Sequence, residues 1–503
     1  MPLARNVKKC LGVLAAMAGC YGVLVFSYSA FLKINYPYMV NLGEPPLSQA
    51  VRFVYEGKIP YRDLSNPPYS LVPYGPVYLY LCAFFRRWVT APFVVGRIWT
   101  LFSTCLTAGF IYLTLKKDTG RLKYALLPVL LFLSHPIVAR WGVQVNVDMM
   151  AVSFALASFY CLWSYVQADL KPTLFLVAGA FLSLVAFFTK SSMMACPAAF
   201  FCFLLLQKKI RTAFIFLLGM GLAAGSVYYL LNWWTHGAYF FHTTYEISKR
   251  HFFPVFIGRF WILAVRQSPL FVAANLFALW QIRQRDKRSF FYLYLFFVLL
   301  LTVSLGKQGS DTNYFLEWLS LSSVALGGML HRLFSVTGGR GESGRRLWAE
   351  AGFYALMLCQ LAPWIAPSWN LVRVKQGYEA SRVFFDRISA LIKKTPGKII
   401  SADMSLLTAN DREIFYEPFP MGQMSYSGVW DERLILKELD ERTLSLVILF
   451  FYAKPLKADR NYTPEFMETF KRNYDYIGRA IPPPDMDSDL GGHPLYFYLP
   501  KKN

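Results

Sequence analysis

The chain has 503 residues, of which 55% are hydrophobic and 17% aromatic, whereas only 16% are charged. Several apolar runs approach or exceed the roughly 20 residues that a helix needs to cross the core of a bilayer, so the composition excludes a typical soluble protein and predicts a polytopic helical membrane protein. The net charge of +22 sits largely in short basic loops between these runs, which is typical of cytoplasmic loops and does not imply a nucleic-acid partner.

The first apolar run, residues 11–32, follows a basic N-terminus that contains Arg5, Lys8 and Lys9. This order predicts a retained helix whose N-terminus is cytoplasmic. The basic loops downstream alternate consistently with ten more apolar runs, so we expect eleven transmembrane helices. The ten further runs are 92–115, 124–140, 146–166, 172–188, 191–206, 211–233, 268–281, 289–305, 312–331 and 347–367.

The same alternation places three parts of the chain on the outer side: the first loop (33–91), the loop 234–267, and the C-terminal part. Residues 370–503 alternate amphipathic helical patterns with apolar strand patterns, which predicts a small α/β domain. The sequence therefore predicts a membrane domain at 1–369 followed by this outer domain. We expect strands of the outer domain at 397–403, 444–452 and 494–500.

An acid in the first loop, Glu44, stands directly before Pro45 and Pro46. Proline suits the first turn of a helix, and apolar residues recur at helical spacing up to Tyr55, so we expect a short amphipathic helix on the outer membrane surface. The helix dipole stabilises an ionised carboxylate at its start. Stabilising the start of the helix is one possible role of Glu44 and could be its whole role. The other is catalytic: the dipole keeps the carboxylate ionised, so that it can accept a proton from a hydroxyl nucleophile. The run 68–86, rich in proline and tyrosine, is expected to lie at the interface without crossing.

Asp148 is the second candidate acid, at the outer end of the helix predicted over 146–166. Ionisable groups at this depth are costly and usually line a cavity or a pathway. Arg97 and Lys190 are cations on the same side, for which a lipid phosphate is a suitable partner, although Arg97 can also snorkel to the headgroups. The densest outer polar cluster of the membrane part is either a turn or the rim of a site, and it contains Lys307, Asp311, Asn313, Tyr314 and Glu317.

Sequence signatures of metal and nucleotide sites are missing. The sequence contains no HExxH motif, no CxxC motif and no Gly-rich phosphate loop with the Lys-Ser/Thr ending. Its acidic run 485–489 is interpreted as a solvated turn, so a metal site built by the protein has little support from the residues.

The chain contains, in this order, the motifs "EGKIPYRDL", "NPPY", "NVDMMAVSFALASFY", "FFTKSS" and "GSDTNYFLEW". Together with the acid of the first loop and the outer α/β domain, they resemble the GT-C superfamily of polyprenyl-phosphate-sugar-dependent glycosyltransferases. The similarity is closest to bacterial family 39-like members, which are related to protein mannosyltransferases and to the aminoarabinose transferase of lipid A. It covers the whole chain.

This resemblance implies an enzyme that transfers a hexose or pentose from a polyprenyl-phosphate-linked donor, with inversion at the anomeric carbon. The acid of the first loop would be the catalytic base or its activator, and it maps onto Glu44. Many members have Asp-Glu here whereas this chain has Gly43 before Glu44, so Asp63 or Asp148 could contribute. The resemblance places the donor phosphate at Arg97, Lys190 and Lys307, and further substrate contacts at Tyr61, His242, Asn313, Tyr314 and Glu317.

The implied setting is the bacterial inner membrane, with a cytoplasmic N-terminus, a periplasmic C-terminal domain, and membrane lipid, the lipid-linked donor and a glycan, lipid or protein acceptor as partners. A divalent cation is the one cofactor that the resemblance leaves open. A lipid or polysaccharide transporter is the alternative function, but the sequence shows no internal repeat and its charged candidates lie toward one face. A non-catalytic scaffold is a third hypothesis, because Gly43 replaces the hallmark Asp.

Overall fold

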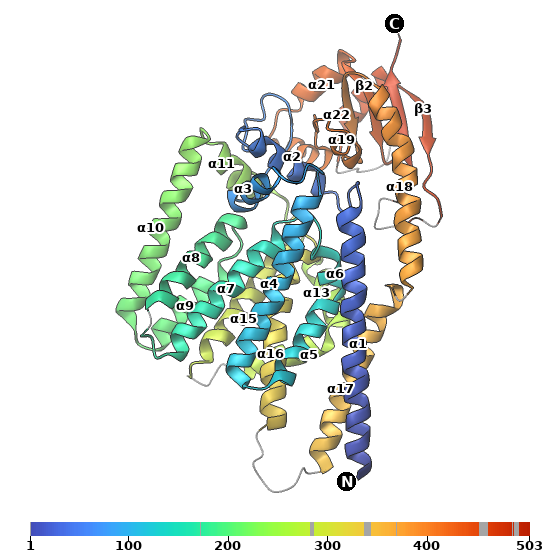
Figure 1. The fold of residues 1–503 in the computed structure, drawn as a ribbon. Helices are drawn as coiled ribbons and strands as arrows, with labels where there is room; N and C mark the ends of the chain where they lie inside the picture. The colour runs from blue at the N-terminus through green and yellow to red at the C-terminus, as the bar shows by residue number, and fades with distance from the viewer. Residues whose placement is uncertain are drawn as a thin grey trace.

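The computed structural model describes residues 2–171, 173–281, 286–335, 344–368, 370–451, 461–484, 486 and 492–502. Within these ranges the chain forms a bundle of long helices with a small α/β domain at one end (Figure 1). The N-terminus lies at the opposite end of the bundle (Figure 1). Of the acidic run 485–489, only Met486 is among the described residues.

Every apolar run predicted to cross the membrane is helical within the described ranges. The run 124–140 is divided at His135 into two helices. The helices of the bundle are α1 (Pro2–Asn35), α4 (Val94–Thr119), α5 (Leu122–Ser134), α6 (Pro136–Trp141), α7 (Asp148–Gln167), α8 (Thr173–Thr189), α9 (Ala195–Leu206), α10 (Ile210–Trp234), α13 (Pro254–Gln267), α14 (Pro269–Trp280), α15 (Ser289–Leu301), α16 (Leu316–Ser335) and α17 (Gly344–Ile365). Short turns connect them: α11 (Ala238–Phe240), η1 (Phe241–Tyr245), α12 (Glu246–Lys249), η3 (Thr302–Gly306) and η4 (Thr312–Phe315).

Among the described residues, five helices are long and apolar enough to cross a membrane. One of the five is α15 together with η3. α13 and α14 add a sixth segment if they count as one span, since the chain bends by 104° between them. The predicted multi-pass helical architecture is confirmed, whereas the number of eleven crossings stays a prediction. α7 is central, with 83% of its apolar span buried, whereas only 6% of the span in α10 is buried, so α10 lies at the edge of the bundle (Figure 1).

The helix predicted after Glu44 is present as α2 (Glu44–Tyr55), and Pro45 and Pro46 occupy its first turn. Its surroundings differ from the prediction, because most of its residues are buried and it lies between the bundle and the α/β domain (Figure 1). The Gln49 side chain exchanges two hydrogen bonds with the backbone of Ile414, at 3.2 Å from Nε2 and 2.5 Å to Oε1. α2 is therefore a connecting element between the two domains and not a helix with one face free for the membrane.

The C-terminal domain begins with α18 (Leu371–Lys394) and contains a sheet of order β1-β2-β4-β3. β1 is parallel to β2, and β4 pairs antiparallel with both of its neighbours. The three predicted strands are confirmed as β1, β2 and β4. The edge strand β3 was not predicted, because most of its residues are exposed and show no buried alternation. The remaining bounds are β1 (Lys398–Ser401), β2 (Leu444–Leu449), β3 (Tyr474–Ala480), β4 (Leu495–Pro500), α19 (Ser405–Thr408), α20 (Pro418–Tyr426), α21 (Arg433–Asp440) and α22 (Pro464–Asn473).

The first loop is fastened to the α/β domain at Tyr69. Tyr69 N donates to Phe415 O at 2.9 Å, and Glu417 N donates to Tyr69 O at 2.9 Å, as in a pair of short parallel strands. The Glu417 carboxylate then accepts hydrogen bonds from Leu71 N at 2.9 Å and from Ser70 Oγ at 3.1 Å. One acidic side chain of the α/β domain thus holds the loop where it passes over the bundle.

The loop meets the bundle at Gly75, whose N–H donates to Thr189 O at 3.3 Å. A Cβ atom at Gly75 would lie 1.9 Å from the carbonyl oxygen of Phe188, so only glycine permits this close approach to the end of α8. The ten-residue helix α3 (Pro76–Phe85) follows, and at about 1.5 Å per residue it is too short to cross a bilayer.

Docking of the first loop should strengthen as the pH falls. Burial raises the pKa of the Glu417 carboxyl to about 7, above its ordinary value of about 4.3, so the folded chain binds a proton that the unfolded chain releases. The stabilisation is complete below about pH 4 and is lost as the pH rises through about 7. We expect the unfolding temperature in detergent to fall between pH 5 and pH 8, because this group loses about 2–3 kcal/mol of its stabilising contribution over that range.

Glu417→Gln should remove this part of the pH dependence, whereas substitution of the exposed Glu413 by Gln should keep it. An identical pH profile for the Glu417→Gln and wild-type chains would contradict the assignment.

Candidate functional site

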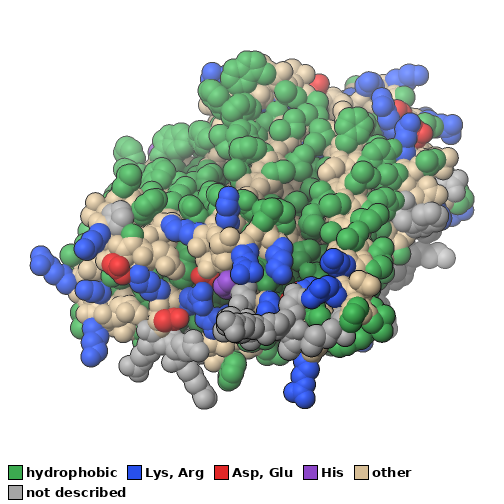
Figure 2. All heavy atoms as spheres, turned by 60° about the horizontal axis from the view of Figure 1, so that its bottom comes forward, with side chains coloured by type: hydrophobic (Ala, Val, Ile, Leu, Met, Phe, Trp, Pro, Cys, Tyr) green, Lys and Arg blue, Asp and Glu red, His purple; other side chains and the backbone are tan. Residues whose placement is uncertain are grey.

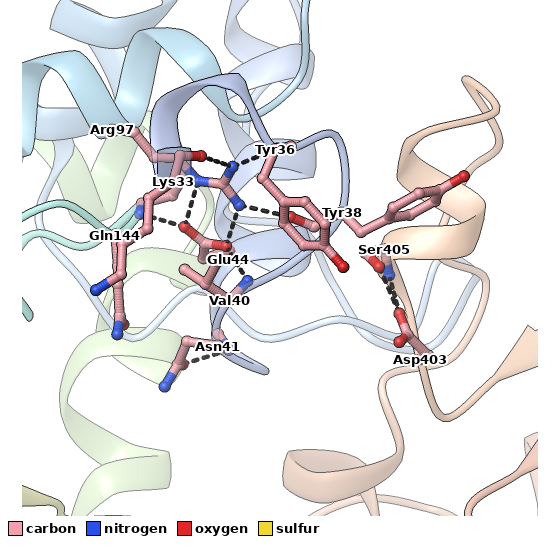
Figure 3. A network of polar contacts seen from close by, with 12 residues as sticks. Lys33, Tyr36, Tyr38, Val40, Asn41, Glu44, Arg97, Gln144, Asp403 and Ser405 are labelled. Atoms are coloured by element: carbon pink, nitrogen blue, oxygen red, sulfur yellow. Dashed lines mark hydrogen bonds and ion pairs between the residues drawn. The ribbon is translucent and has the colours of Figure 1, made fainter. Parts of the chain in front are cut away.

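Arg97 of α4 and Glu44 form an ion pair with no exposed surface (Figure 3). The guanidinium binds both carboxylate oxygens, with Nε to Oε1 at 2.9 Å and Nη2 to Oε2 at 2.6 Å, and it lies 4.9 Å from the ring centre of Phe93. Its other N–H groups donate to carbonyls at the end of α1 and in the segment between α1 and α2. These are Lys33 O at 2.6 Å, Tyr36 O at 2.5 Å and Tyr38 O at 2.6 Å.

All five N–H groups of Arg97 are therefore used inside the protein. A phosphate could bind this guanidinium only if some of these bonds were exchanged, so the role of Arg97 in binding the donor stays a prediction. The geometry gives Arg97 a structural function that the sequence did not indicate.

The Glu44 carboxylate is equally saturated. Besides the two bonds from Arg97, Oε2 accepts from Val40 N at 2.8 Å and Oε1 accepts from Val145 N at 2.7 Å. A carboxylate has about four acceptor positions, and all of them are filled here. Gly43, at the position of the hallmark Asp, has φ −79°, a value open to any residue, so the backbone does not require glycine there. The assignment of Glu44 as base stays a prediction, and its visible role is to hold Val145.

Val145 belongs to the turn that leads into α7, and this turn positions Asp148, the first residue of the helix. Asp148 N donates to Asn146 Oδ1 at 2.7 Å, and the carbonyl of Asn146 accepts from Thr100 Oγ1 at 3.2 Å. The Glu44–Arg97 pair and α4 thus hold the turn from two sides. The position of Asp148 depends on groups far away in the sequence.

Asp148 is the centre of a polar cluster built from three of the sequence motifs. Its side chain is buried with a residue exposure of 2%, forms a short ion pair with Lys190 through Oδ1, and accepts a hydrogen bond from Asn313 Nδ2 at 3.0 Å through Oδ2. The Lys190 ammonium also lies 4.1 Å from the ring centre of Tyr314. The structure therefore brings together residues that are separated by up to 165 positions.

The cluster lines a small cavity between the start of α7, the α8–α9 connection, η3 and the start of α16. Glu317 also lines it and accepts a hydrogen bond from Tyr294 Oη at 2.6 Å. Two buried polar atoms of the lining, Ser192 Oγ and Asn313 Oδ1, have no hydrogen-bond partner in the described part of the chain. Buried polar atoms are normally paired, so these two atoms are available to a water molecule or to a polar group of a ligand.

Two residues near this cavity were not singled out by the sequence. Arg250 forms a bidentate ion pair with Glu246, at 2.9 Å and 3.0 Å, and is close enough to Tyr74 and Tyr314 to interact electrostatically with both. Tyr74, from the first loop, interacts in the same way with Asp148 and Lys190. The sequence could have indicated Arg250, because it is a cation in a loop predicted to lie outside. Lys190 was selected for the same reason.

Tyr61 and His242, predicted as substrate contacts, hold the first loop instead of lining the cavity. Tyr61 Oη donates to Tyr74 O at 2.8 Å. His242 Nδ1 accepts from Val72 N at 3.0 Å, and Nε2 bonds Arg62 O at 2.7 Å. Burial lowers the pKa of His242 to about 4, so the ring is neutral at pH 7 and can serve both bonds. Both residues keep the loop, and with it Tyr74, beside the Asp148 cluster.

Neither Asp63 nor Lys307 lines the cavity at Asp148. Asp63 is exposed and caps its own turn, accepting from Ser65 N at 3.1 Å and from Ser65 Oγ at 2.9 Å. Lys307 is half-buried and pairs through its backbone with Phe252. Within the described ranges, no three His, Cys, Asp or Glu side chains come together as a metal ligand set, and the divalent cation stays an open expectation.

Arg97→Gln should strongly destabilise the fold, because it leaves the Glu44 carboxylate buried without its counter-ion. Breaking a buried pair typically costs about 3–5 kcal/mol, measured here as the free energy of unfolding in detergent. The double variant Arg97→Gln/Glu44→Gln should recover part of this loss, since no charge stays buried.

Arg140→Gln is the matched control, because Arg140 pairs with Asp311 at 3.3 Å while 48% of its side chain is exposed. We expect it to cost less than about 1 kcal/mol. Equal stability of the Arg97 and Arg140 variants would show that the buried pair does not anchor the fold.

Comparisons with known proteins agree with this architecture. A family model described as dolichyl-phosphate-mannose-protein mannosyltransferase matches residues 72–233. No curated protein sequence matches the chain.

Two solved structures superpose on almost the whole of the chain. ArnT from Cupriavidus metallidurans, bound to undecaprenyl phosphate, is 12% identical, with a TM-score of 0.60 over 96% of this chain and 97% of ArnT. The archaeal oligosaccharyltransferase AglB from Archaeoglobus fulgidus, in complex with an inhibitory peptide and a dolichol-phosphate, is also 12% identical, with a TM-score of 0.51 over 95% of this chain and 74% of AglB. The chain therefore has the fold of ArnT and AglB, which is the GT-C fold that its motifs predict.

Proposed function

We propose that this chain transfers a hexose or pentose from a polyprenyl-phosphate-linked donor to an acceptor hydroxyl, with inversion at the anomeric carbon. The observation that carries the proposal is the buried pair of Asp148 and Lys190 in a cavity with unpartnered polar atoms. The fold supports it, because ArnT and AglB were solved with undecaprenyl phosphate and dolichol-phosphate respectively.

The distribution of charge supports a periplasmic position for this cavity. Lysines and arginines gather at the end of the bundle opposite the α/β domain, below a surface that is mostly hydrophobic (Figure 2). Around Glu350 at this end, Lys8 and Lys123 approach the carboxylate to 3.0 Å and 3.9 Å, and Arg346 to 3.3 Å. Basic ends of helices lie on the cytoplasmic side of a membrane protein. The first loop, Asp148 and the α/β domain would then face the periplasm of a bacterial inner membrane.

The donor phosphate is proposed to bind Lys190. In the structure this ammonium is held by Asp148, and a phosphodiester that enters the cavity offers it a competing anion. When the bond between C1 of the sugar and the phosphate oxygen breaks, the electron pair stays on the oxygen and polyprenyl phosphate leaves. Lys190, with Arg250 as a second cation, stabilises the charge that develops there.

When Lys190 binds the phosphate, it releases the Asp148 carboxylate, and Oδ1 of Asp148 becomes available. We assign Asp148 as the general base: it takes the proton of the acceptor hydroxyl while that oxygen forms its bond to C1. Attack from the face opposite the leaving phosphate inverts the configuration. Asn313 keeps the second carboxylate oxygen in place, and Glu317 and Tyr314 are available to the hydroxyl groups of the sugar.

Asp148→Asn should lower the release of polyprenyl phosphate by about 10² to 10⁴, the usual contribution of a general base. Lys190→Gln should reduce it by about 10² to 10³, because charge on the leaving group loses its partner. The measurement is the release of polyprenyl phosphate from the lipid-linked sugars of membranes that contain the expressed chain, with unfolding temperatures as a check of folding.

Asp63→Asn is the control, because this exposed acid caps only its own turn, and it should retain transfer. The variant Glu44→Gln tests whether Glu44 or Asp148 is the catalytic base. If a folded Glu44→Gln variant loses all transfer while Asp148→Asn keeps it, the base is Glu44. If neither variant changes the release, the proposed reaction does not take place at this cluster.

A further inference from the structure

A groove of two adjoining pockets lies where the first loop, the bundle and the α/β domain meet. Its walls come mainly from α2, the end of α3, the start of α4 and the turn after α19, and α2 contacts both α3 and α19 (Figure 1). The two pockets share Ser48, Arg86 and Pro92, and neither has a lining residue in common with the Asp148 cavity.

The groove is small. Each of its two pockets has a volume of about 10 Å³, which is room for one group of the size of a water molecule or an oxygen atom. A ligand that binds here must therefore be small, or it must place only a small part of itself in the groove and keep the rest outside.

The charged side chains of the groove are mainly cationic. Arg52, Arg86 and Arg412 line it together with one acid, Asp411, so two positive charges are in excess. Arg52 Nε lies 3.6 Å from a carboxylate oxygen of Glu56, and Arg412 donates to backbone carbonyls. The guanidinium of Arg86 has no ion pair or hydrogen bond in the described part of the chain. The groove therefore attracts an anion.

Two polar atoms of the lining, Ser48 Oγ and Arg52 Nε, are buried without a hydrogen-bond partner within the described ranges. Ser48 is only 2% exposed and lines both pockets. Both atoms can donate a hydrogen bond to an oxygen. Burial and the nearby charge of Arg52 lower the pKa of Arg86, and a bound anion would relieve this repulsion between like charges. The groove thus offers unused donors as well as unbalanced charge.

The surface beside the groove has the features of a membrane interface. Trp88 and Phe84 are 66% and 48% exposed, and their ring centres lie 5.4 Å apart. The guanidinium of Arg87 lies 5.3 Å from the ring centre of Phe84. Exposed aromatic rings beside arginines are typical of the level of the lipid headgroups. The apolar helix α4 begins at Val94, directly after this connection, so lipid phosphates are the anions at hand.

We propose that the groove binds the phosphate of an anionic phospholipid from the leaflet next to the α/β domain, as a structural lipid and not as a substrate. The phosphate oxygens enter the pockets and accept hydrogen bonds from Arg86, Arg52 and Ser48, since the fork of a guanidinium suits phosphate. The glycerol and the acyl chains remain outside, beside Trp88 and Phe84. The excess of positive charge favours a lipid with a net negative charge over a zwitterionic one.

A phosphate in this groove would strengthen the joint between the three parts of the molecule. Arg52 of α2 already donates from Nη1 to Asp411 O of the α/β domain at 3.2 Å. Arg86 follows α3 and has no such partner, so a phosphate shared by Arg52 and Arg86 adds a bond between α2 and the bundle. The lipid therefore stabilises the docked first loop. Because the groove is separate from the Asp148 cavity, the proposal does not depend on the transferase function.

The test uses the full chain in mixed micelles of detergent and phosphatidylcholine, titrated with phosphatidylglycerol, with the unfolding temperature and native mass spectrometry as readouts. We expect phosphatidylglycerol to raise the unfolding temperature and to remain bound in the mass spectrum. Arg86→Gln should raise the half-saturating fraction of phosphatidylglycerol about tenfold, since one charge-assisted contact is lost. Arg87→Gln is the matched control, because Arg87 is the exposed neighbour outside the lining, and it should titrate as wild type does.

The variant Arg86→Gln should fold without added lipid, because its guanidinium has no hydrogen bond or ion pair to lose within the described ranges. Mass spectra of the folded protein compare lipid binding directly, so the result does not depend on small differences in stability. Asp148→Asn should bind phosphatidylglycerol as wild type does, since the groove takes no part in transfer.

Three results would overturn the site. One is equal stabilisation by added phosphatidylcholine, and another is the same titration for Arg86→Gln and wild type. The third is an equal loss of binding in Arg87→Gln, because the lipid would then respond only to surface charge. If inorganic phosphate displaces phosphatidylglycerol at equal concentration, the groove binds a free anion and the proposed lipid is wrong.

Discussion

The arrangement of this membrane protein depends on one buried ion pair. Removing Glu44 and Arg97 from water is costly, and it is compensated only because every donor and acceptor of the pair is used. The partners are the segment after α1, the start of α2, α4 and the turn before α7. A single pair thus fixes the mutual positions of four segments at the end of the bundle where the polar groups gather.

The cavity at Asp148 depends on this pair. The turn that it holds through Val145 ends at Asp148, whose side chain lines this cavity. The hydrogen bonds of the turn matter for the proposed reaction, because a general base must hold its hydrogen-bonding distance to the reacting oxygen.

The first loop closes the site through contacts of a different kind. Its backbone pairs with the α/β domain at Tyr69, approaches α8 at Gly75, and is held by the neutral ring of His242 in between. The α/β domain therefore contributes to the site without supplying a reacting group, since it holds the loop that carries Tyr74.

The sequence alone determined the helical membrane class, the α/β domain and three of its strands, because apolar length and hydrophobic period are local properties. It also singled out Asp148 and Lys190, because charges at that depth are costly wherever they occur. Only the tertiary structure decided that the two bond each other, and that Glu44 is saturated by an arginine 53 positions away. The same reason applies to Arg250, since its neighbours Tyr74 and Tyr314 come from segments that meet only in the fold.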